Sequence, residues 1–199
     1  MKKTILALAI AVVLCFISCS ATLPGSFAET TYTEDFSFLE NMEEYSYDRF
    51  TKEWKYRSTG TTEQNVSISI YFQGKGNDIT FSPIIFFGST RYGVPEVAYF
   101  LIGEDVYKAT LHSDDYLGGL ILGLHAKNLL EALSHTDSIV LRLTTGSKNI
   151  DIELAGSEYE DLIRRHIVLL LEHHVIECYD QYDHSSASFF KNMCPIEKY

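Results

Sequence analysis

The chain has 199 residues, the length of one domain with a leader or a tail rather than of two full domains. Hydrophobic residues make up 46% of it and charged residues 22%, which excludes a largely disordered chain. Its net charge of −11 repels phosphate backbones, so we expect no nucleic acid among its partners.

The N-terminal segment 1–18 has the pattern of an export signal. Lys2 and Lys3 give it a basic start, and residues 4–17 carry no charge. This apolar run is shorter than the roughly 20 residues that a membrane-spanning helix needs. A basic start, a short apolar run and small residues after it are typical of a signal peptide that is removed on export.

The residues Phe16-Ile17-Ser18-Cys19 end this segment, and they resemble the lipobox of bacterial lipoproteins. The resemblance implies that the Cys19 thiol receives a diacylglyceryl group and becomes the N-terminus of a membrane-anchored, palmitate-bearing envelope protein. Two or more acyl chains are enough to hold a protein on a membrane. Ser20 in place of Asp implies the outer membrane in a Gram-negative cell. Ordinary cleavage after Ala21 or after Ala28 is the alternative.

Two cysteines are left once Cys15 leaves with the leader and Cys19 is lipidated. An exported protein folds in an oxidising compartment, so we expect a disulfide bond between Cys178 and Cys194. In the chain-entropy model such a bond contributes about 3 kcal/mol of stability. The alternative is a pair of unpaired thiols, with Cys178 buried on a helix.

Residues 19–44 are predicted to form a tether between the anchor and the domain. The segment is polar and acidic, and Pro24-Gly25 breaks it, as is typical of a linker. Its apolar residues Phe36, Phe38 and Leu39 alternate loosely near the end. We therefore expect that end to dock on the domain.

Aromatic residues open the domain, mainly at a spacing of two. They are Tyr45, Tyr47, Phe50, Trp54 and Tyr56. This spacing predicts an amphipathic strand. The alternative is a binding face, where Tyr and Trp are enriched. Apolar and polar residues then alternate over 66–73, which predicts a strand with one buried face.

Turn residues and a return strand follow. Residues 74–77 carry two glycines and an asparagine, which predicts a turn, and residues 79–87 form the expected return strand. Pro83 removes a backbone donor from that strand, so we expect the strand to lie at an edge or to be bulged there. Further short strands are predicted over residues 97–102, 106–111 and 116–124.

A short helix and a hairpin come next. Leu129, Leu130 and Leu133 form the apolar stripe of a two-turn helix over residues 126–134. Residues 139–143 and 150–154 then alternate between apolar and other side chains. With Gly146-Ser147 as a two-residue loop, glycine stands where a type II′ turn requires it.

Counting outward from that loop gives the register of the hairpin. It pairs Leu143 with Ile150, Leu141 with Ile152, and Ile139 with Leu154. The same register places Arg142 opposite Asp151. Apolar residues then share one face and opposite charges meet on the other, whereas a slip of one residue would bury the charges.

A long C-terminal helix is predicted over residues 158–179. Apolar residues cover most of its circumference, so we expect it to pack on the sheet. Ser157 is the expected N-cap, with Glu160 as its capping-box partner. Residues 183–199 are expected to be an irregular polar tail, tied back through Cys194.

A stripe of ligand-type side chains follows the predicted helix. Its members are His166, His173, Glu177, Asp180 and His184. His173 and Glu177 are four residues apart, so on a continuous helix they could share a metal ion. The alternative is a solvated stripe on an otherwise buried helix.

Catalytic motifs are weak in this sequence. His112-Ser113-Asp114-Asp115 resembles a hydrolytic cluster only by adjacency, and an acidic turn is the simpler interpretation. The chain contains neither a GxSxG elbow nor a GxGxxG nucleotide loop, and we expect no cofactor.

Strands followed by helices predict an α+β fold in a single domain over residues 45–182. We expect an antiparallel sheet of about six to eight strands, packed by the long C-terminal helix and the short one. The predicted function is a non-catalytic binding or assembly module of the cell envelope with an acidic surface. Its expected partners are the membrane, through the lipid anchor, and a basic envelope protein. The alternative is an envelope hydrolase or metal-binding protein that uses scattered His and Asp residues.

Overall fold

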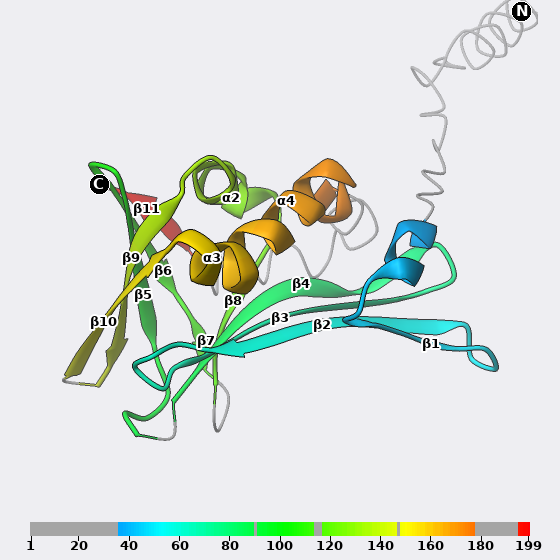
Figure 1. The fold of residues 1–199 in the computed structure, drawn as a ribbon, viewed down its shortest axis with the longest axis horizontal. Helices are drawn as coiled ribbons and strands as arrows, with labels where there is room; N and C mark the ends of the chain where they lie inside the picture. Colours follow the sequence, from blue (N-terminus) through cyan, green and yellow to red (C-terminus); the bar gives the residue numbers. More distant parts are fainter. Residues whose placement is uncertain (1–35, 90, 114–116, 147, 178–194) are drawn as a thin grey trace, which may run out of the picture. The chain divides into compact units, whose positions relative to one another are not determined.

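The computed structural model describes residues 36–89, 91–113, 117–146, 148–177 and 195–199. All of them belong to the unit Thr33–Tyr199. Within it, the strands form two antiparallel sheets and the helices are short (Figure 1). The expected α+β class is confirmed. The expected single sheet is wrong, because the strands divide into one sheet of six and one of five.

The six-stranded sheet, here the large sheet, has the order β1-β2-β3-β4-β8-β7. Its strands are β1 (Tyr45–Asp48), β2 (Glu53–Thr61), β3 (Ser67–Lys75), β4 (Asp78–Gly88), β7 (His112–Ser113) and β8 (Gly118–Ile121). The alternation over residues 66–73 is confirmed, since Val66, Ile68, Ile70 and Phe72 are all buried. The aromatic cluster spans the β1–β2 hairpin: Trp54 and Tyr56 are buried, whereas Phe50 at the tip is fully exposed.

Pro83 lies in β4, an interior strand, and the bulge that the sequence allowed is present. The register between β3 and β4 shifts between the pairs Tyr71–Ile84 and Gln73–Phe81. Between these two pairs β4 advances by three residues and β3 by two, so one residue of β4 has no partner on β3. Pro83, which has no backbone N–H to donate, lies in this irregular stretch.

The five-stranded sheet, here the small sheet, has the order β10-β9-β5-β6-β11. Its strands are β5 (Val97–Ile102), β6 (Asp105–Thr110), β9 (Ser138–Thr145), β10 (Lys148–Ala155) and β11 (Ile196–Lys198). The expected irregular tail is therefore wrong for its last residues, which form β11 and pair with β6. The rest of that tail, including Cys194, lies outside the described residues.

The predicted register of the β9–β10 hairpin is confirmed. Leu143 faces Ile150, Leu141 faces Ile152 and Ile139 faces Leu154, and all six side chains are buried. On the other face, Arg142 donates to Asp151 from Nε at 2.6 Å and from Nη2 at 2.7 Å. Gly146 has a φ of +55°, as the first loop residue of a primed turn requires.

The helices are η1 (Phe36–Asn41), η2 (Leu124–Ala126), α2 (Lys127–Ser134), α3 (Gly156–Tyr159), the π-helical turn η3 (Glu160–Arg164) and α4 (Arg165–Glu172). Leu129, Leu130 and Leu133 of α2 are buried, as predicted. The C-terminal helix is not continuous: α4 ends at Glu172, and His174 has a φ of +52°. Nor does a capping box begin it, because the N-cap is Ala155 and makes no side-chain capping bond. Glu160 pairs instead with Arg164 at 2.8 Å.

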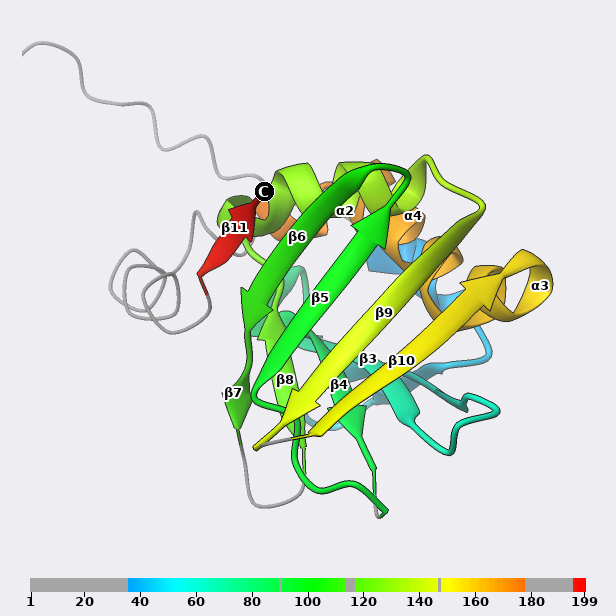
Figure 2. The ribbon, with the colours of Figure 1, turned by 90° about the vertical axis from the view of Figure 1, so that its left-hand side faces the viewer.

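The core lies between the sheets and the helices. Tyr56 and Phe72 from the large sheet, Phe100 and Leu141 from the small sheet, and Leu170 from α4 are all fully buried. Phe36 and Leu39 of η1 also enter the core, which agrees with the expected docking of the tether's end. In Figure 2 the small sheet faces the viewer and the described helices lie behind it, so none of them covers the face turned toward the viewer. None of the described helices is long and apolar enough to cross a membrane.

Candidate functional site

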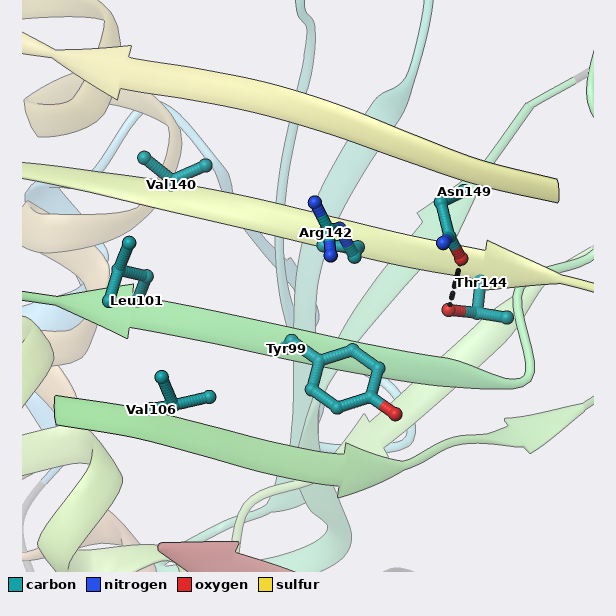
Figure 3. Close-up of a pocket in the computed structure, with 7 residues that line it drawn as sticks. All are labelled: Tyr99, Leu101, Val106, Val140, Arg142, Thr144 and Asn149. Atoms are coloured by element: carbon teal, nitrogen blue, oxygen red, sulfur yellow. Dashed lines mark hydrogen bonds between the residues drawn. The ribbon is translucent and has the colours of Figure 1, made fainter. Parts of the chain in front are cut away.

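The candidate site is a hollow of about 400 Å³, here the outer hollow, on the face of the small sheet that none of the described helices covers. Its lining comes from four neighbouring strands and comprises Tyr99, Leu101, Val106, Val140, Arg142, Thr144 and Asn149 (Figure 3). The hollow is open to solvent, and its floor is the backbone of β5 and β9.

Strand alternation places these side chains together. Tyr99 of β5 pairs with Arg142 of β9, and Leu101 pairs with both Val140 of β9 and Val106 of β6. Directly paired residues on one face of a sheet have their side chains side by side. Ala98 and Phe100, the residues on either side of Tyr99 in β5, are fully buried on the other face.

Three of the lining side chains make an apolar strip across β6, β5 and β9 near the β5–β6 turn (Figure 3). Leu101 is 39% exposed, and Val106 and Val140 beside it are half-buried. The half-buried ring of Tyr99, two residues from Leu101, continues the strip along β5 (Figure 3). A strip of this kind favours contact with an apolar surface, because covering it removes hydrocarbon from water.

The polar side chains around the strip form hydrogen bonds and ion pairs with neighbouring side chains. The two hydrogen bonds from Arg142 hold the pKa of the Asp151 carboxyl below its ordinary value. Thr144 Oγ1 donates to Asn149 Oδ1 at 2.9 Å, and the Lys108 ammonium lies 3.4 Å from Glu197 on β11. Polar groups that already have hydrogen-bond partners are not left unsatisfied when a partner protein excludes water from above them.

A second polar arrangement lies inside the protein, between β2 and the start of α4. The hydroxyl of Tyr56 is 2.6 Å from His166 Nδ1, and His166 Nε2 is 3.0 Å from the carbonyl oxygen of Asp161. Arg165 Nε also lies 3.4 Å from Nε2, but the carbonyl oxygen of Asp161 is closer and can only accept. The shorter contact therefore favours the hydrogen on Nε2, with Tyr56 donating to Nδ1. Burial is the largest influence on this ring and lowers the pKa of His166.

Above this pair lies a polar hollow of about 630 Å³, in which Arg165 contacts Glu44 at 2.5 Å. The hollow is lined by Glu43, Glu44, Arg57, Ser58, Thr59, Gly60, Asp161, Leu162 and Arg165. Both His166 nitrogens are engaged below it, so the ring is held as a satisfied core histidine.

The predicted metal ligands have other contacts in the structure. The ring of His173 stacks on Phe38, with centroids 3.6 Å apart and planes 6° from parallel. Glu177 contacts His174 Nδ1 at 2.5 Å and the Lys127 ammonium at 3.3 Å. Among the described residues, no three His, Cys, Asp or Glu side chains are grouped to hold a metal ion. Metal binding by His173 and Glu177 stays a prediction.

The other predicted site residues are scattered or not described. Cys19, Cys178 and Cys194 lie outside the described residues, as do Asp180 and His184. His112 and Ser113 form the short strand β7, and Asp114 and Asp115 are not described.

The outer hollow was not predicted, although the sequence carried a signal for it. Residues 97–102 are all apolar or aromatic, so the strand is apolar on both faces. Such a strand is expected where both faces are covered. In the structure the described helices cover only one face of β5, and the other face lies under the outer hollow.

Comparisons with protein-family models, curated proteins and solved structures returned no match for this chain.

Proposed function

We propose that this protein is a lipid-anchored cell-envelope protein whose domain is a non-catalytic binding module, and that its partner docks on the outer hollow. The lipobox-like residues Phe16 to Cys19 support the anchor. The observation that supports binding most directly is the apolar strip of Leu101, Val106 and Val140. It lies beside Tyr99 on a sheet face that none of the described helices covers. Apolar centres with aromatic neighbours and polar rims are typical of protein interfaces.

The charges around the hollow favour a basic partner. On this face Arg142 is matched by Asp151 and Lys108 by Glu197. Glu153, two residues along β10 from Asp151, adds a further exposed carboxylate. The net charge of −11 for the whole chain acts in the same direction, because it attracts a basic protein over distances of about a Debye length.

Photo-crosslinking in cells tests this docking face. A crosslinking amino acid at Leu101 is expected to give a discrete adduct, because that side chain is 39% exposed in the middle of the apolar strip. The matched position is Lys55, which is exposed on β2 of the large sheet and is expected to give none. A Val140→Asp change places a charge in the strip and is expected to remove the Leu101 adduct.

Two results would contradict the docking face. One is the absence of any adduct from Leu101 in cells that produce the protein at normal levels. The other is an adduct pattern that is the same from Leu101 and Lys55, since nonspecific collision would give that outcome.

A further inference from the structure

The strand at one edge of the small sheet is unlike the other sheet edges. The described sheets have four edge strands, and three of them are short: β1 has four residues, β7 two and β11 three. The fourth, β10, has eight residues and pairs with β9 at every one of them without a register shift. Short strands, bulges, prolines and charged side chains are the usual protection of an exposed edge. Of these β10 has only the charged side chains, Lys148, Asp151 and Glu153, so its backbone stays accessible to a partner of suitable charge.

The backbone groups that β10 presents at this edge can be assigned. In a hairpin with a two-residue loop, the closing pair exchanges hydrogen bonds, so Lys148 points its backbone groups toward Thr145. Alternate residues then point the same way, and the bond from Gly156 N to Asp137 O, 3.3 Å long, agrees with this parity. The amide and carbonyl groups of Asn149, Asp151 and Glu153 therefore point away from β9.

Within the described chain, β10 pairs with β9 alone, and Figure 2 shows it as the outermost strand of the small sheet. Its side chains divide by face: Ile150, Ile152 and Leu154 are buried in the core, and Asn149, Asp151 and Glu153 lie on the outer face. Asn149 also lines the outer hollow, so this edge and the hollow form one continuous surface.

A second copy of the chain is a poor occupant for this edge. Antiparallel pairing of β10 with another β10 in one continuous sheet matches residues on the same face. The registers centred on Asp151 and on Ile152, which pair the most residues, set Asp151 opposite Asp151 or opposite Glu153. The register centred on Ile150 sets Asp151 opposite Asn149, but it pairs only residues 148–152 of each strand. Like charges directly opposite one another destabilise a strand pair.

We propose that β10 receives an extended segment of a partner protein in which basic residues alternate with apolar ones. The segment adds one strand to the small sheet through the outward groups of Asn149, Asp151 and Glu153. Its basic side chains lie on the outer face beside the two carboxylates, and its apolar ones lie beside Ile150 and Ile152. Backbone bonds then supply affinity, and the side-chain alternation supplies selectivity. This inference rests on the proposed function of the domain as a binding module.

The test titrates the full-length protein with a fluorescent peptide in which lysine and valine alternate. The control peptide has the same composition in two blocks. We expect the alternating peptide to bind at least about tenfold more tightly. As an added strand it places all its lysines on one face and all its valines on the other, whereas each face of the block peptide carries both residue types. Equal binding of the two peptides would overturn the proposal, since charge alone would then explain it.

Two variants at Glu153 distinguish the contribution of its backbone amide to peptide binding from that of its carboxylate. Glu153→Pro removes an outward amide donor, and the ladder to β9 does not use that donor. We expect this change to weaken peptide binding by about tenfold or more, and Glu153→Gln by only about two- to fivefold. Binding by the proline variant equal to that of the glutamine variant would show that no strand is added.

Amide hydrogen exchange of the wild-type protein gives the answer if the proline variant does not fold. The peptide is expected to protect the amides of Asn149, Asp151 and Glu153, and unchanged exchange there overturns the proposal. A Leu101 adduct in cells together with unchanged exchange would contradict the added strand but would still support the proposed binding module. Absence of the adduct would contradict the proposed function itself.

Discussion

His166 is a buried residue whose neutral state depends on the fold. Its side chain is 1% exposed, its two nitrogens are engaged by Tyr56 and Asp161, and Arg165 lies beside it with Glu44. An imidazolium at this place would lose its hydration and would have to donate from Nδ1 to a hydroxyl that now donates to it. The neutral ring is therefore part of the folded state.

This geometry predicts a pH dependence of stability. Because burial lowers the pKa of His166 in the folded chain, the unfolded chain takes up the proton first. The stabilising contribution is complete above the ordinary value of 6.5 and is lost as the pH falls below it. We expect the free energy of unfolding, measured in urea, to fall more steeply toward acid for the wild type than for His166→Gln. Parallel curves for the two proteins would contradict this.

The sequence could not place His166 correctly. Its spacing from His173 and Glu177 suggested one solvated or metal-binding stripe. The partner that fixes its role is Tyr56, 110 residues earlier in the chain. A contact between β2 and α4 depends on how the sheet and the helices pack, and no local pattern reports that.

Among the elements, the β9–β10 hairpin was predicted best. Its register follows from two local facts, the alternation of apolar residues and a glycine in the loop, and both act within a few residues. The same locality explains why Val97–Ile102 was predicted with its observed bounds. The strand β11 and the break after α4 were missed, because the first depends on a distant strand and the second interrupts a continuous apolar run.

The loop of that hairpin gives a second prediction. Gly146 has a φ of +55°, a conformation that costs an L residue roughly 1–2 kcal/mol. We expect Gly146→Val to lower the free energy of unfolding by at least that amount, measured in urea. Gly146→Asn is the matched control and should lose much less, because asparagine tolerates this region. Equal losses for both variants would show that the loop does not keep this conformation in solution.

At the scale of the whole molecule, two properties could not be predicted from local sequence patterns. The division into two sheets is decided by which strands meet, and β4 pairs with β8 across an intervening hairpin of the small sheet. The outer hollow is likewise assembled from β5, β6, β9 and β10. The alternation within each strand was readable in the sequence, whereas the side-by-side arrangement of Tyr99 and Arg142 required the sheet order.

The proposed anchor is also a whole-molecule property, and it predicts a labelling result. If Cys19 carries acyl chains, labelled palmitate enters the wild-type protein and not a Cys19→Ala variant. The mature wild-type mass then corresponds to a chain that begins at residue 19 with its acyl groups. A mass for an unmodified chain beginning at Thr22 or Glu29 would contradict the anchor, and equal label in both proteins would place it elsewhere.

The position of β11 has a consequence for the order of folding. Its three residues, Ile196–Lys198, pair with β6, which ends at Thr110. A short turn joins β5 to β6, whereas residues 111–195 separate β6 from β11. We therefore expect β6 to pair with β5 early, because that pairing closes a short loop, and its other side to stay open until this strand of three residues docks.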